Sequence, residues 1–250
     1  MNKNIWILGD THGHFGHILD AVRMHRPQAL IHVGDVTGDG EEPLPLAEME
    51  EILSLTELWW IPGNHDTDSE RQYDALFSGA FAGQNLDGRV VTIAGIRVAG
   101  LGGVFRSKVW RPPADPTYQS AAKYIRWTGR GSRWRDGLPL RHRSTIFPDV
   151  YRKLATQRAD VLVTHEAPGM HVYGNHAIDD LARALRVEAA YHGHQHDRPD
   201  YSPAWARLGY RAYGVGYCGI TRLGGEVIRP GDYDDDRADR PVEVEPTAGQ

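Results

Sequence analysis

The strongest constraint on the fold of this chain is a series of short apolar runs that each end in glycine or a polar residue. Runs of this length and composition are typical of buried β-strands. Five of the runs are followed by carboxylate, imidazole or amide side chains, in the segments Gly9–Gly13, Gly34-Asp35, Pro62–Asp66, Thr164-His165 and His192–His196. Because the carboxyl ends of parallel strands meet at one edge of an open α/β sheet, these side chains are expected to lie together there.

The apolar runs and the helical repeats between them predict a mixed α/β architecture. Strand and helix alternate in the first half, which predicts parallel pairing, whereas short turns such as Ala94-Gly95 and Gly224-Gly225 in the second half predict antiparallel hairpins. The predicted helices are Phe15–His25, Leu44–Leu55, Pro148–Gln157 and Ile178–Leu185. The predicted strands are Ile5–Leu8, Ala29–Val33, Leu58–Ile61, Val90–Ile93, Ile96–Leu101, Val161–Val163, Ala189–Tyr191, Arg211–Val215 and Glu226–Ile228.

Composition narrows the class of protein. Of the 250 residues, 40% are apolar and 24% are charged, as in ordinary globular domains, and the net charge of −5 excludes polyanion binding through bulk charge. The single cysteine, Cys218, excludes an intrachain disulfide and fits a reducing compartment; its apolar surroundings predict packing rather than a catalytic thiol. The run Ile5–Leu8 is too short for a signal peptide or membrane span, so a cytoplasmic protein with no membrane partner is expected.

Two segments depart from the strand and helix pattern. Residues 106–143 carry ten Lys or Arg residues against two Asp, a local charge of +8, with five Trp and Tyr residues between them. Cations for phosphates and aromatic rings for bases predict a nucleotide or nucleic-acid contact. In the alternative, which composition supports equally, the cations pair with the acidic remainder and the aromatic residues pack the segment down. The tail 231–250 is acidic with few apolar residues, which predicts disorder.

The residue types at the strand ends suit divalent metal ions. Asp, His and Asn supply oxygen and imidazole nitrogen donors, a mixture that favours Mn²⁺, Fe or Zn²⁺ over a metal held by thiolates. Asp10 and His12 are two residues apart, as are His194 and His196, so each pair shares one face of an extended segment. The sequence therefore predicts a metal site built from several strand ends.

The order and spacing of these residues resemble the calcineurin-like metallophosphoesterase superfamily. Its pattern is D-x-H, G-D, G-N-H-[D/E], H and G-H-x-H, and the chain carries all five blocks in order as Asp10-Thr11-His12, Gly34-Asp35, Gly63-Asn64-His65-Asp66, His165 and Gly193-His194-Gln195-His196. The resemblance implies an α/β/β/α sandwich of two mixed β-sheets flanked by helices. It would be formed by a domain over residues 1–230, with 106–143 as a basic, Trp-rich insert and 231–250 as the disordered tail.

The resemblance also implies a role for each matching position. Two divalent metal ions would be bound, with Mn²⁺ favoured and Fe, Zn²⁺ and Ni²⁺ as alternatives. A hydroxide bridging the metals would attack the phosphate ester, while His65, which binds no metal, would contact the phosphate and assist the leaving group. Asp35 would bridge the two ions, with Asp10, His12 and His196 holding the first and Asn64, His165 and His194 holding the second.

The basic segment is the main indication of substrate class. Gly100–Arg106, the insert and Arg141-His142-Arg143 are similar to the RNA lariat-debranching branch of the superfamily, in which the matching loop recognises branched RNA. The expected function is therefore a phosphodiesterase or nuclease acting on nucleotide or nucleic-acid esters, and the alternative is a phosphomonoesterase acting on a phosphoprotein or small metabolite. Substrate contacts are expected from Arg106, Arg130, Arg133 and Arg143.

A non-catalytic binding scaffold with the same fold is a further alternative. The resemblance disfavours it, because such scaffolds typically lose metal ligands or the catalytic histidine and this chain keeps all of them. Structural roles are expected for the histidines outside the motifs, among which His171, His176 and His192 could border the site. The sequence gives no indication of the oligomeric state.

Overall fold

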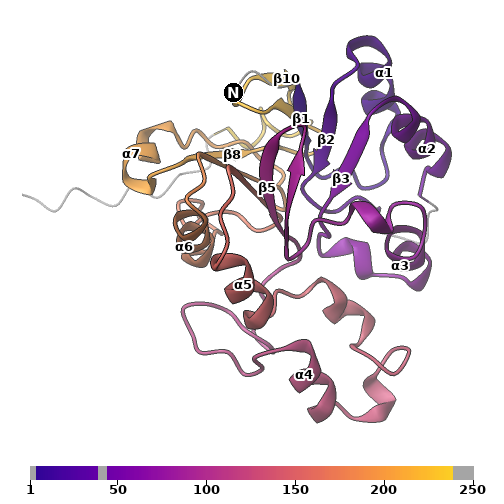
Figure 1. Ribbon diagram of the computed structural model, residues 1–250, viewed down its shortest axis with the longest axis vertical. Helices are drawn as coiled ribbons and strands as arrows, with labels where there is room; N and C mark the ends of the chain where they lie inside the picture. The colour runs from indigo at the N-terminus through magenta and orange to yellow at the C-terminus, as the bar shows by residue number, and fades with distance from the viewer. Residues whose placement is uncertain (1–3, 39–43, 239–250) are drawn as a thin grey trace, which may run out of the picture.

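The computed structural model describes residues 4–38 and 44–238, and within them ten strands form two five-stranded mixed sheets (Figure 1). The predicted α/β/β/α class is therefore confirmed. The first sheet has the order β10 (Val227–Arg229), β9 (Ile220–Arg222), β1 (Ile5–Leu8), β2 (Ala29–His32) and β3 (Glu57–Trp60). The second has the order β4 (Arg89–Ile93), β5 (Ile96–Leu101), β6 (Val161–Thr164), β7 (Ala189–His192) and β8 (Arg211–Gly214).

Helices cover the outer face of each sheet. The first sheet packs against α1 (Gly16–His25), α2 (Leu46–Leu55) and α3 (Glu70–Phe77). The second packs against α5 (Pro148–Ala155), α6 (His176–Leu185) and α7 (Trp205–Leu208), while α4 (Ala121–Trp127) lies in the insert. Short 3-10 helices are η1 (His65–Thr67), η2 (Ala82–Gln84), η3 (Arg130–Ser132), η4 (Leu140–Ser144) and η5 (Ser202–Ala204). Across the described ranges no helix has the length and apolar character needed to cross a membrane.

The alternation of side chains along the strands creates the layers. In β1, Ile5 and Ile7 belong to the apolar cluster between the two sheets, whereas Trp6 and Leu8 belong to the cluster under α1 and α2. Successive residues of a strand point to opposite faces, so a strand that is apolar throughout can be buried on both sides. This explains why the central strands are continuous apolar runs in the sequence.

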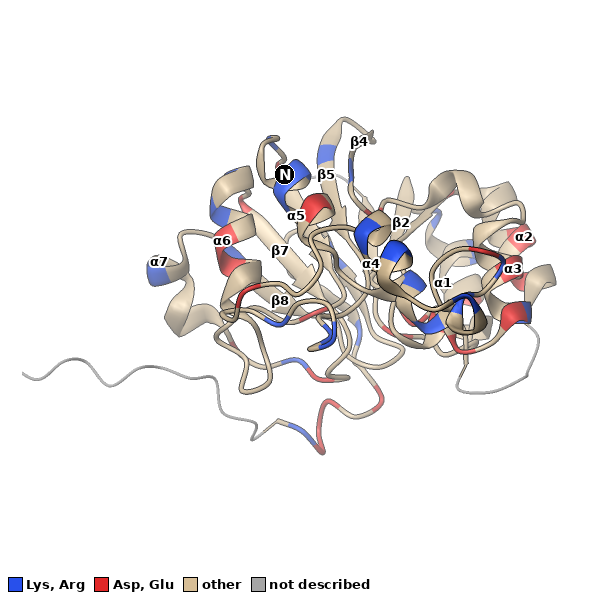
Figure 2. Cartoon of the chain, turned by 90° about the horizontal axis from the view of Figure 1, so that it is seen from below, with Lys and Arg blue, Asp and Glu red and all other residues tan. Residues whose placement is uncertain are grey.

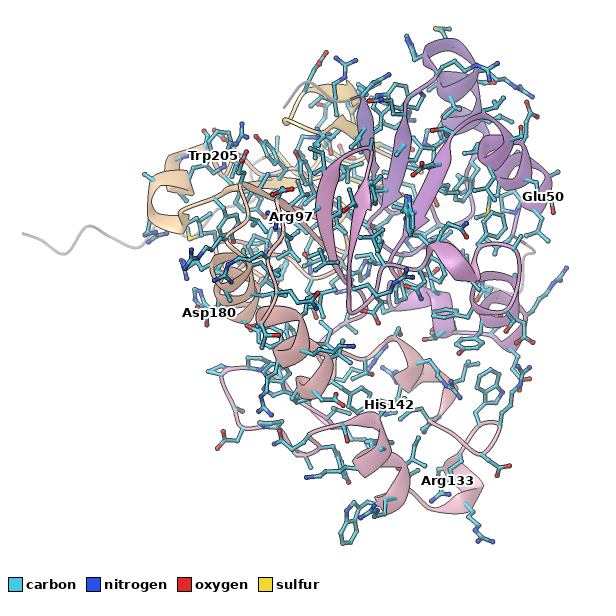
Figure 3. All side chains as sticks on the ribbon, in the orientation of Figure 1. Glu50, Arg97, Arg133, His142, Asp180 and Trp205 are labelled. Atoms are coloured by element: carbon cyan, nitrogen blue, oxygen red, sulfur yellow. The ribbon has the colours of Figure 1, made fainter. Side chains whose placement is uncertain are left out.

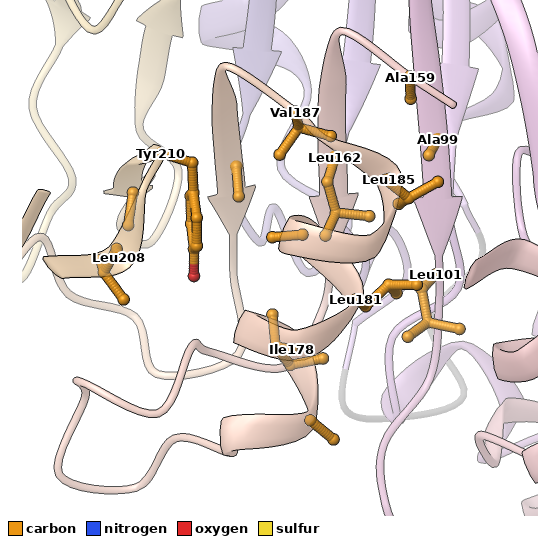
Figure 4. Packing of buried hydrophobic residues seen from close by; sticks show 14 of the residues in the cluster. Ala99, Leu101, Ala159, Leu162, Ile178, Leu181, Leu185, Val187, Leu208 and Tyr210 are labelled. Atoms are coloured by element: carbon orange, nitrogen blue, oxygen red, sulfur yellow. The ribbon is translucent and has the colours of Figure 1, made fainter. Parts of the chain in front are cut away.

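The second sheet is closed by α6, whose apolar residues face the strands. Ile178, Leu181 and Leu185 are spaced for one helical face and pack with Leu162 of β6 (Figure 4). Complete burial of one such side chain stabilises the fold by about 1.5–3 kcal/mol. Asn175 caps the start of the helix, and its side chain accepts a hydrogen bond from the Ala177 amide at 2.9 Å.

Strand pairing confirms part of the predicted topology and corrects part of it. The turns at Ala94-Gly95 and Gly224-Gly225 close the antiparallel pairs β4–β5 and β9–β10, as predicted. The prediction of antiparallel pairing was wrong for β5, β6, β7 and β8, which are parallel neighbours. Long connections that include α5, α6 and α7 join these strands, and such crossovers return the chain in the same direction.

The insert and residues 231–238 both make contacts within the protein. The insert has a small core of Val109, Tyr124 and Leu138 with Phe147, and it lies at the lower end of the molecule in Figure 1. Residues 231–238, predicted as part of a disordered tail, are held to the domain, for example by Asp234, whose Oδ2 atom lies 3.0 Å from Arg198 Nε. Residues 239–250, the rest of that predicted tail, lie outside the described residues.

Candidate metal centre

The loops after β1, β2, β3, β6 and β7 bring the predicted ligands together where the carboxyl ends of parallel strands meet. Their carboxylate and imidazole atoms form two groups, in each of which all ligand atoms lie within 4.8 Å of one another. Asp35 belongs to both groups. The first group is Asp10, His12, Asp35 and His196, and the second is Asp35, His165 and His194.

The first group is packed closely around a buried carboxylate. His196 Nε2 lies 3.2 Å from Asp10 Oδ2 and 3.2 Å from His12 Nε2. Asp10 Oδ2 also accepts a hydrogen bond from the His194 amide at 2.8 Å. Asp10 Oδ1 is buried and has no hydrogen-bond partner among the described residues. A buried carboxylate oxygen is costly without a partner, so this atom fits a metal ligand.

The second group is fixed by a histidine that uses both ring nitrogens. His165 Nδ1 lies 2.9 Å from the Val33 carbonyl oxygen, to which it donates a hydrogen bond. The other nitrogen, His165 Nε2, lies 3.3 Å from Asp35 Oδ2 and 3.1 Å from Asn64 Oδ1. A backbone carbonyl on one nitrogen selects the tautomer that presents the other to a metal. Asn64 therefore adds an amide oxygen to the second group.

Charges in the site shift the pKa values of its residues. Burial alone would lower the pKa of His165, but the Asp35 and Asp10 carboxylates raise it to about 10. Burial raises the pKa of Asp35, and the neighbouring His165 charge reverses this and lowers it overall. Burial, with the His165 charge second, lowers the pKa of His194 to about 4. The carboxylates thus favour the protonated form of His165, and the charge of His165 in turn favours the ionised form of Asp35.

The backbone at the ligands is unusual. His12, Asp35, His194 and His196 have φ values of 44°, 52°, 67° and 53°. Residues with side chains adopt this left-handed region rarely, at a cost of about 1–3 kcal/mol, and it occurs mainly where the surrounding structure enforces it. Here the His12 amide donates to the Asp35 carbonyl oxygen at 3.0 Å, which links two of the four turns. Backbone contacts of this kind hold the ligand residues in their turns.

His65 lies beside the two groups and belongs to neither. Its amide donates to Asp35 Oδ1 at 2.8 Å, and its ring centroid is 5.3 Å from that of His12. The imidazole Nδ1 atom lies 2.7 Å from Asp68 Oδ2. Asp68 is three residues later in the turn at η1, a partner that the motif alone did not indicate. The side chain of His65 is 34% exposed, so its ring is open to solvent beside the two groups.

Asp66, the last residue of the Gly63–Asp66 motif, has a structural role. It is fully buried, and its carboxylate accepts hydrogen bonds from the Gly63 amide at 2.7 Å and from the Thr37 amide at 2.8 Å. These bonds tie the loop after β3 to the loop after β2. Burial, and secondarily the charge of Asp35, raise the pKa of Asp66 to about 7.

Aromatic and basic residues from the C-terminal part of the chain surround the first group. The Tyr217 ring lies 5.4 Å from His12 and 5.0 Å from His196, and Tyr233 lies 4.9 Å from Tyr217. Arg237 Nη1 donates to the carbonyl oxygens of Gln195 and His196 at 2.7 Å and 3.1 Å. The sequence did not indicate Tyr233 and Arg237 as neighbours, because residues 231–238 read as part of an acidic tail.

Histidines outside the motifs have structural partners. His171 Nε2 lies 3.0 Å from Asp197 Oδ2, and His192 Nε2 lies 2.8 Å from the Tyr201 hydroxyl. His176 is exposed and contacts Asp179.

Cys218 is buried as predicted, and burial raises its pKa to about 12. A thiol with this pKa is not a nucleophile near neutral pH, which favours the packing role.

The predicted substrate-binding arginines fall into different surroundings. Arg106 lines a cavity of about 370 Å³ together with Asn64 and His194. Arg133 donates to the carbonyl oxygens at the end of α4, and Arg143 donates to the Tyr73 hydroxyl, so both are engaged within the protein. Arg130 is exposed in η3. Of the four, the structure brings Arg106 to the metal centre.

The aromatic residues of the insert mostly pack within the protein. Tyr124 is completely buried, Trp110 packs between Phe105 and Tyr151, and Trp134 packs against Tyr73. Trp127, by contrast, is 76% exposed. These contacts agree with the alternative in which aromatic residues pack the segment down.

Comparison with known proteins agrees with the geometry. A structure of TT1561 from Thermus thermophilus has a TM-score of 0.51 with 12% identity, over 88% of this chain and 94% of that one, which shows a shared fold. An uncharacterised protein of Haemophilus influenzae is 35% identical over 224 residues, covering 90% of this chain and 96% of its own length. Residues 3–198 match the family described as calcineurin-like phosphoesterase. The chain belongs to the calcineurin-like phosphoesterase family.

Proposed function

We propose that the protein hydrolyses phosphate esters with two divalent metal ions held by the two groups that share Asp35. The overlap of the groups at one buried carboxylate carries this proposal, since a shared ligand allows two ions to act on one phosphoryl group. Mn²⁺ is the favoured ion, with Fe, Zn²⁺ and Ni²⁺ as alternatives, because the donors are oxygens and imidazole nitrogens. The first ion would be held by Asp10, His12 and His196, and the second by Asn64, His165 and His194.

The side chains around the ions have separate tasks in this proposal. When bound, the ions would supply a water molecule of lowered pKa as nucleophile and offset charge on the phosphoryl oxygens. His65 would hydrogen-bond the leaving oxygen and give it a proton. Asp68 orients the His65 ring, since its Oδ2 atom lies 2.7 Å from Nδ1. Val33 orients His165 in the same manner through its carbonyl oxygen.

A phosphodiester of a nucleotide or nucleic acid is the favoured substrate. Its support is Arg106, which places a cation of the insert in the same cavity as Asn64 and His194. The alternative is a phosphomonoesterase acting on a phosphoprotein or small metabolite. Rates on bis-p-nitrophenyl phosphate and p-nitrophenyl phosphate with Mn²⁺ decide between the two, and a strong preference for the monoester would reject the diesterase.

Metal content tests the assignment of the two groups. Native protein reconstituted with Mn²⁺ is expected to hold about two ions per chain by plasma mass spectrometry, and Asp10→Ala and His194→Ala about one each. Asp35→Ala should weaken metal binding at both proposed ion sites. His25→Ala serves as the control, because His25 is an exposed residue of α1. If native protein hydrolyses neither ester with any of the four metals, the hydrolase proposal fails and the non-catalytic scaffold becomes the better interpretation.

A further inference from the structure

Two adjoining cavities connect the metal centre to the insert. The first, of about 370 Å³, is lined by Asn64 and His194 of the metal centre and by Arg106 and Arg111 of the insert. The second, of about 460 Å³, shares Phe105, Arg106 and Arg111 with the first and adds Lys108 and Arg141. The two cavities together form a depression, here called the basic groove, that starts at the second metal group.

The cations of the basic groove have no acidic partners at salt-bridge distance among the residues that the structure describes. Arg106 contacts hydroxyl groups, with Nε 3.1 Å from Thr145 Oγ1, while Lys108, Arg111 and Arg141 are exposed. Glu166 also lines the first cavity, where its Oε1 atom accepts a hydrogen bond from the Phe105 amide at 2.8 Å. One carboxylate against four cations leaves the groove strongly positive.

Other cations of the insert behave differently. Arg135 lies 2.6 Å from Asp74 Oδ1, and Arg133 donates to Ile125 and Thr128 carbonyl oxygens. Figure 3 shows Arg133 at the outer end of the insert, whereas His142, which lines the groove, lies closer to the sheets. Figure 2 shows basic residues on α4 and acidic residues on α2 and α3. The four cations of the basic groove therefore differ from Arg133 and Arg135 of the same insert, which are engaged by other groups of the protein.

The cations that line the second cavity also act on the pKa of His142, which lines the same cavity. Burial, followed by the charges of Arg106, Lys108 and Arg141, lowers the pKa of His142 to about 4. Burial, followed by the charge of Arg141, also lowers the pKa of Arg106. Like charges gathered in this way repel one another, and an anion bound between them would relieve that repulsion. The groove is thus suited to a phosphate group.

We propose that Arg106, Lys108, Arg111 and Arg141 bind a second phosphate group of the substrate, separate from the phosphate that is cleaved. This inference rests on the proposed hydrolase function. The substrate would be an ester with at least two phosphate groups, whether a nucleotide with a terminal phosphate or a polynucleotide. Guanidinium groups are well matched to phosphate oxygens, and the packed aromatic residues of the insert indicate that phosphates, more than bases, are recognised here.

Three thymidine esters that differ in the number and kind of their phosphate groups test this. The first is a dithymidine with one phosphodiester, the second carries an added 5′-phosphate, and the third is a trithymidine with two phosphodiesters. For native protein with Mn²⁺, kcat/KM for the second or third should exceed that for the first by about tenfold, as expected for charge-assisted contacts to phosphate. In Arg111→Gln and Arg141→Gln this ratio should fall toward one, and added salt should lower the native ratio.

Arg126→Gln is the matched control, because Arg126 is exposed on α4 and does not line the groove. It should keep the native ratio. Thermal unfolding of each variant checks folding, and Arg111 and Arg141 are chosen because both are exposed. If the thymidine esters are not cleaved, their inhibition constants against bis-p-nitrophenyl phosphate hydrolysis provide the same ratio.

The outcomes separate this inference from the proposed function. A gain from the 5′-phosphate identifies a nucleotide-sized substrate, and a gain confined to trithymidine identifies a polynucleotide; both support the subsite. A native ratio of one, or an unchanged ratio in the Arg111→Gln/Arg141→Gln double variant, overturns it. Absence of any metal-dependent hydrolysis of bis-p-nitrophenyl phosphate would instead reject the proposed function.

Discussion

His165 and Val33 are joined by a 2.9 Å hydrogen bond from the imidazole Nδ1 atom to the backbone carbonyl oxygen. The bond links the loop after β6 in one sheet to the end of β2 in the other. It also directs Nε2 of His165 toward Asp35, 3.3 Å away. The packing of the two sheets therefore decides which nitrogen a metal would meet.

Metal binding should release about one proton at pH 7, from His165. Its pKa of about 10, raised by Asp35 and Asp10 against the lowering effect of burial, means that the metal-free site is protonated there. Mn²⁺ must displace this proton, so affinity should rise as pH increases from about 6 to about 9. Calorimetric titration in buffers of different ionisation enthalpy measures the proton count, and a count of zero for native protein would contradict the prediction.

The raised pKa of His165 also predicts how the stability of the metal-free protein depends on pH. Because the folded-state pKa of His165 lies above its ordinary value of 6.5, the group adds stability that is fully present below pH 6.5 and is lost as pH rises through about 10. Urea unfolding in the presence of a chelator should show this decline over that pH window. The decline should be smaller in His165→Asn.

Gly63→Ala should displace Asp35, the residue shared by the two ligand groups. A Cβ atom at residue 63 would overlap the Oδ1 atom and the backbone nitrogen of Asp35. Overpacking of this kind costs about 1–3 kcal/mol, and displacement of Asp35 should reduce metal content. Gly83→Ala is the control, since a Cβ there has no described atom within 4 Å and should change stability by less than about 0.5 kcal/mol. Equal unfolding midpoints for the two variants would count against this account.

His65→Ala should lower kcat without lowering metal content, because His65 lies outside both ligand groups. A group that assists proton transfer contributes about 10²–10⁴-fold to the rate. Asp68→Asn should give a smaller loss, since it alters only the orientation of the ring. Rates on bis-p-nitrophenyl phosphate and metal analysis of the same samples provide the test. Loss of bound Mn²⁺ in His65→Ala would show that this residue is a ligand.

Arg133→Ala should weaken the insert rather than substrate binding. It removes hydrogen bonds to the carbonyl oxygens of Ile125 and Thr128 and should cost about 1–3 kcal/mol locally. Limited proteolysis should cut residues 106–143 faster than in native protein, with Arg126→Ala as the control. If Arg133→Ala instead binds thymidine esters more weakly and its insert is not digested faster by the protease, the result supports the substrate contact predicted from the sequence.

The sequence predicted β1, β2, β6 and β7 well because each of these strands is a run of residues buried on both faces. It missed α3 and α4 because both helices are short, with eight and seven residues, so neither shows a long helical repeat. Each helix is capped by a serine side chain, Ser69 for α3 and Ser120 for α4. It missed β9 because this three-residue strand follows a glycine-rich turn without a clear run. Long-range pairing, not local propensity, creates that strand.

The candidate ligands could be read from five short motifs, whereas their surroundings could not. Arg106, Arg133 and Arg143 are alike in sequence, and only the path of the insert separates a residue of the basic groove from two that hold the insert together. Tyr233 reaches Tyr217 from a segment whose composition resembles a loose tail. Such contacts depend on tertiary packing, which composition does not report.

The contact of Arg237 with the carbonyl oxygens of Gln195 and His196 has a consequence for the biosynthesis of the protein. His12 and His196 are 184 positions apart in sequence, and the backbone of the second is held by a residue made 41 positions later. A chain emerging from the ribosome would have its first ligands available long before this clasp exists. The first ligand group is therefore complete only once residue 196 has been made, and the Arg237 contact is added 41 residues after that.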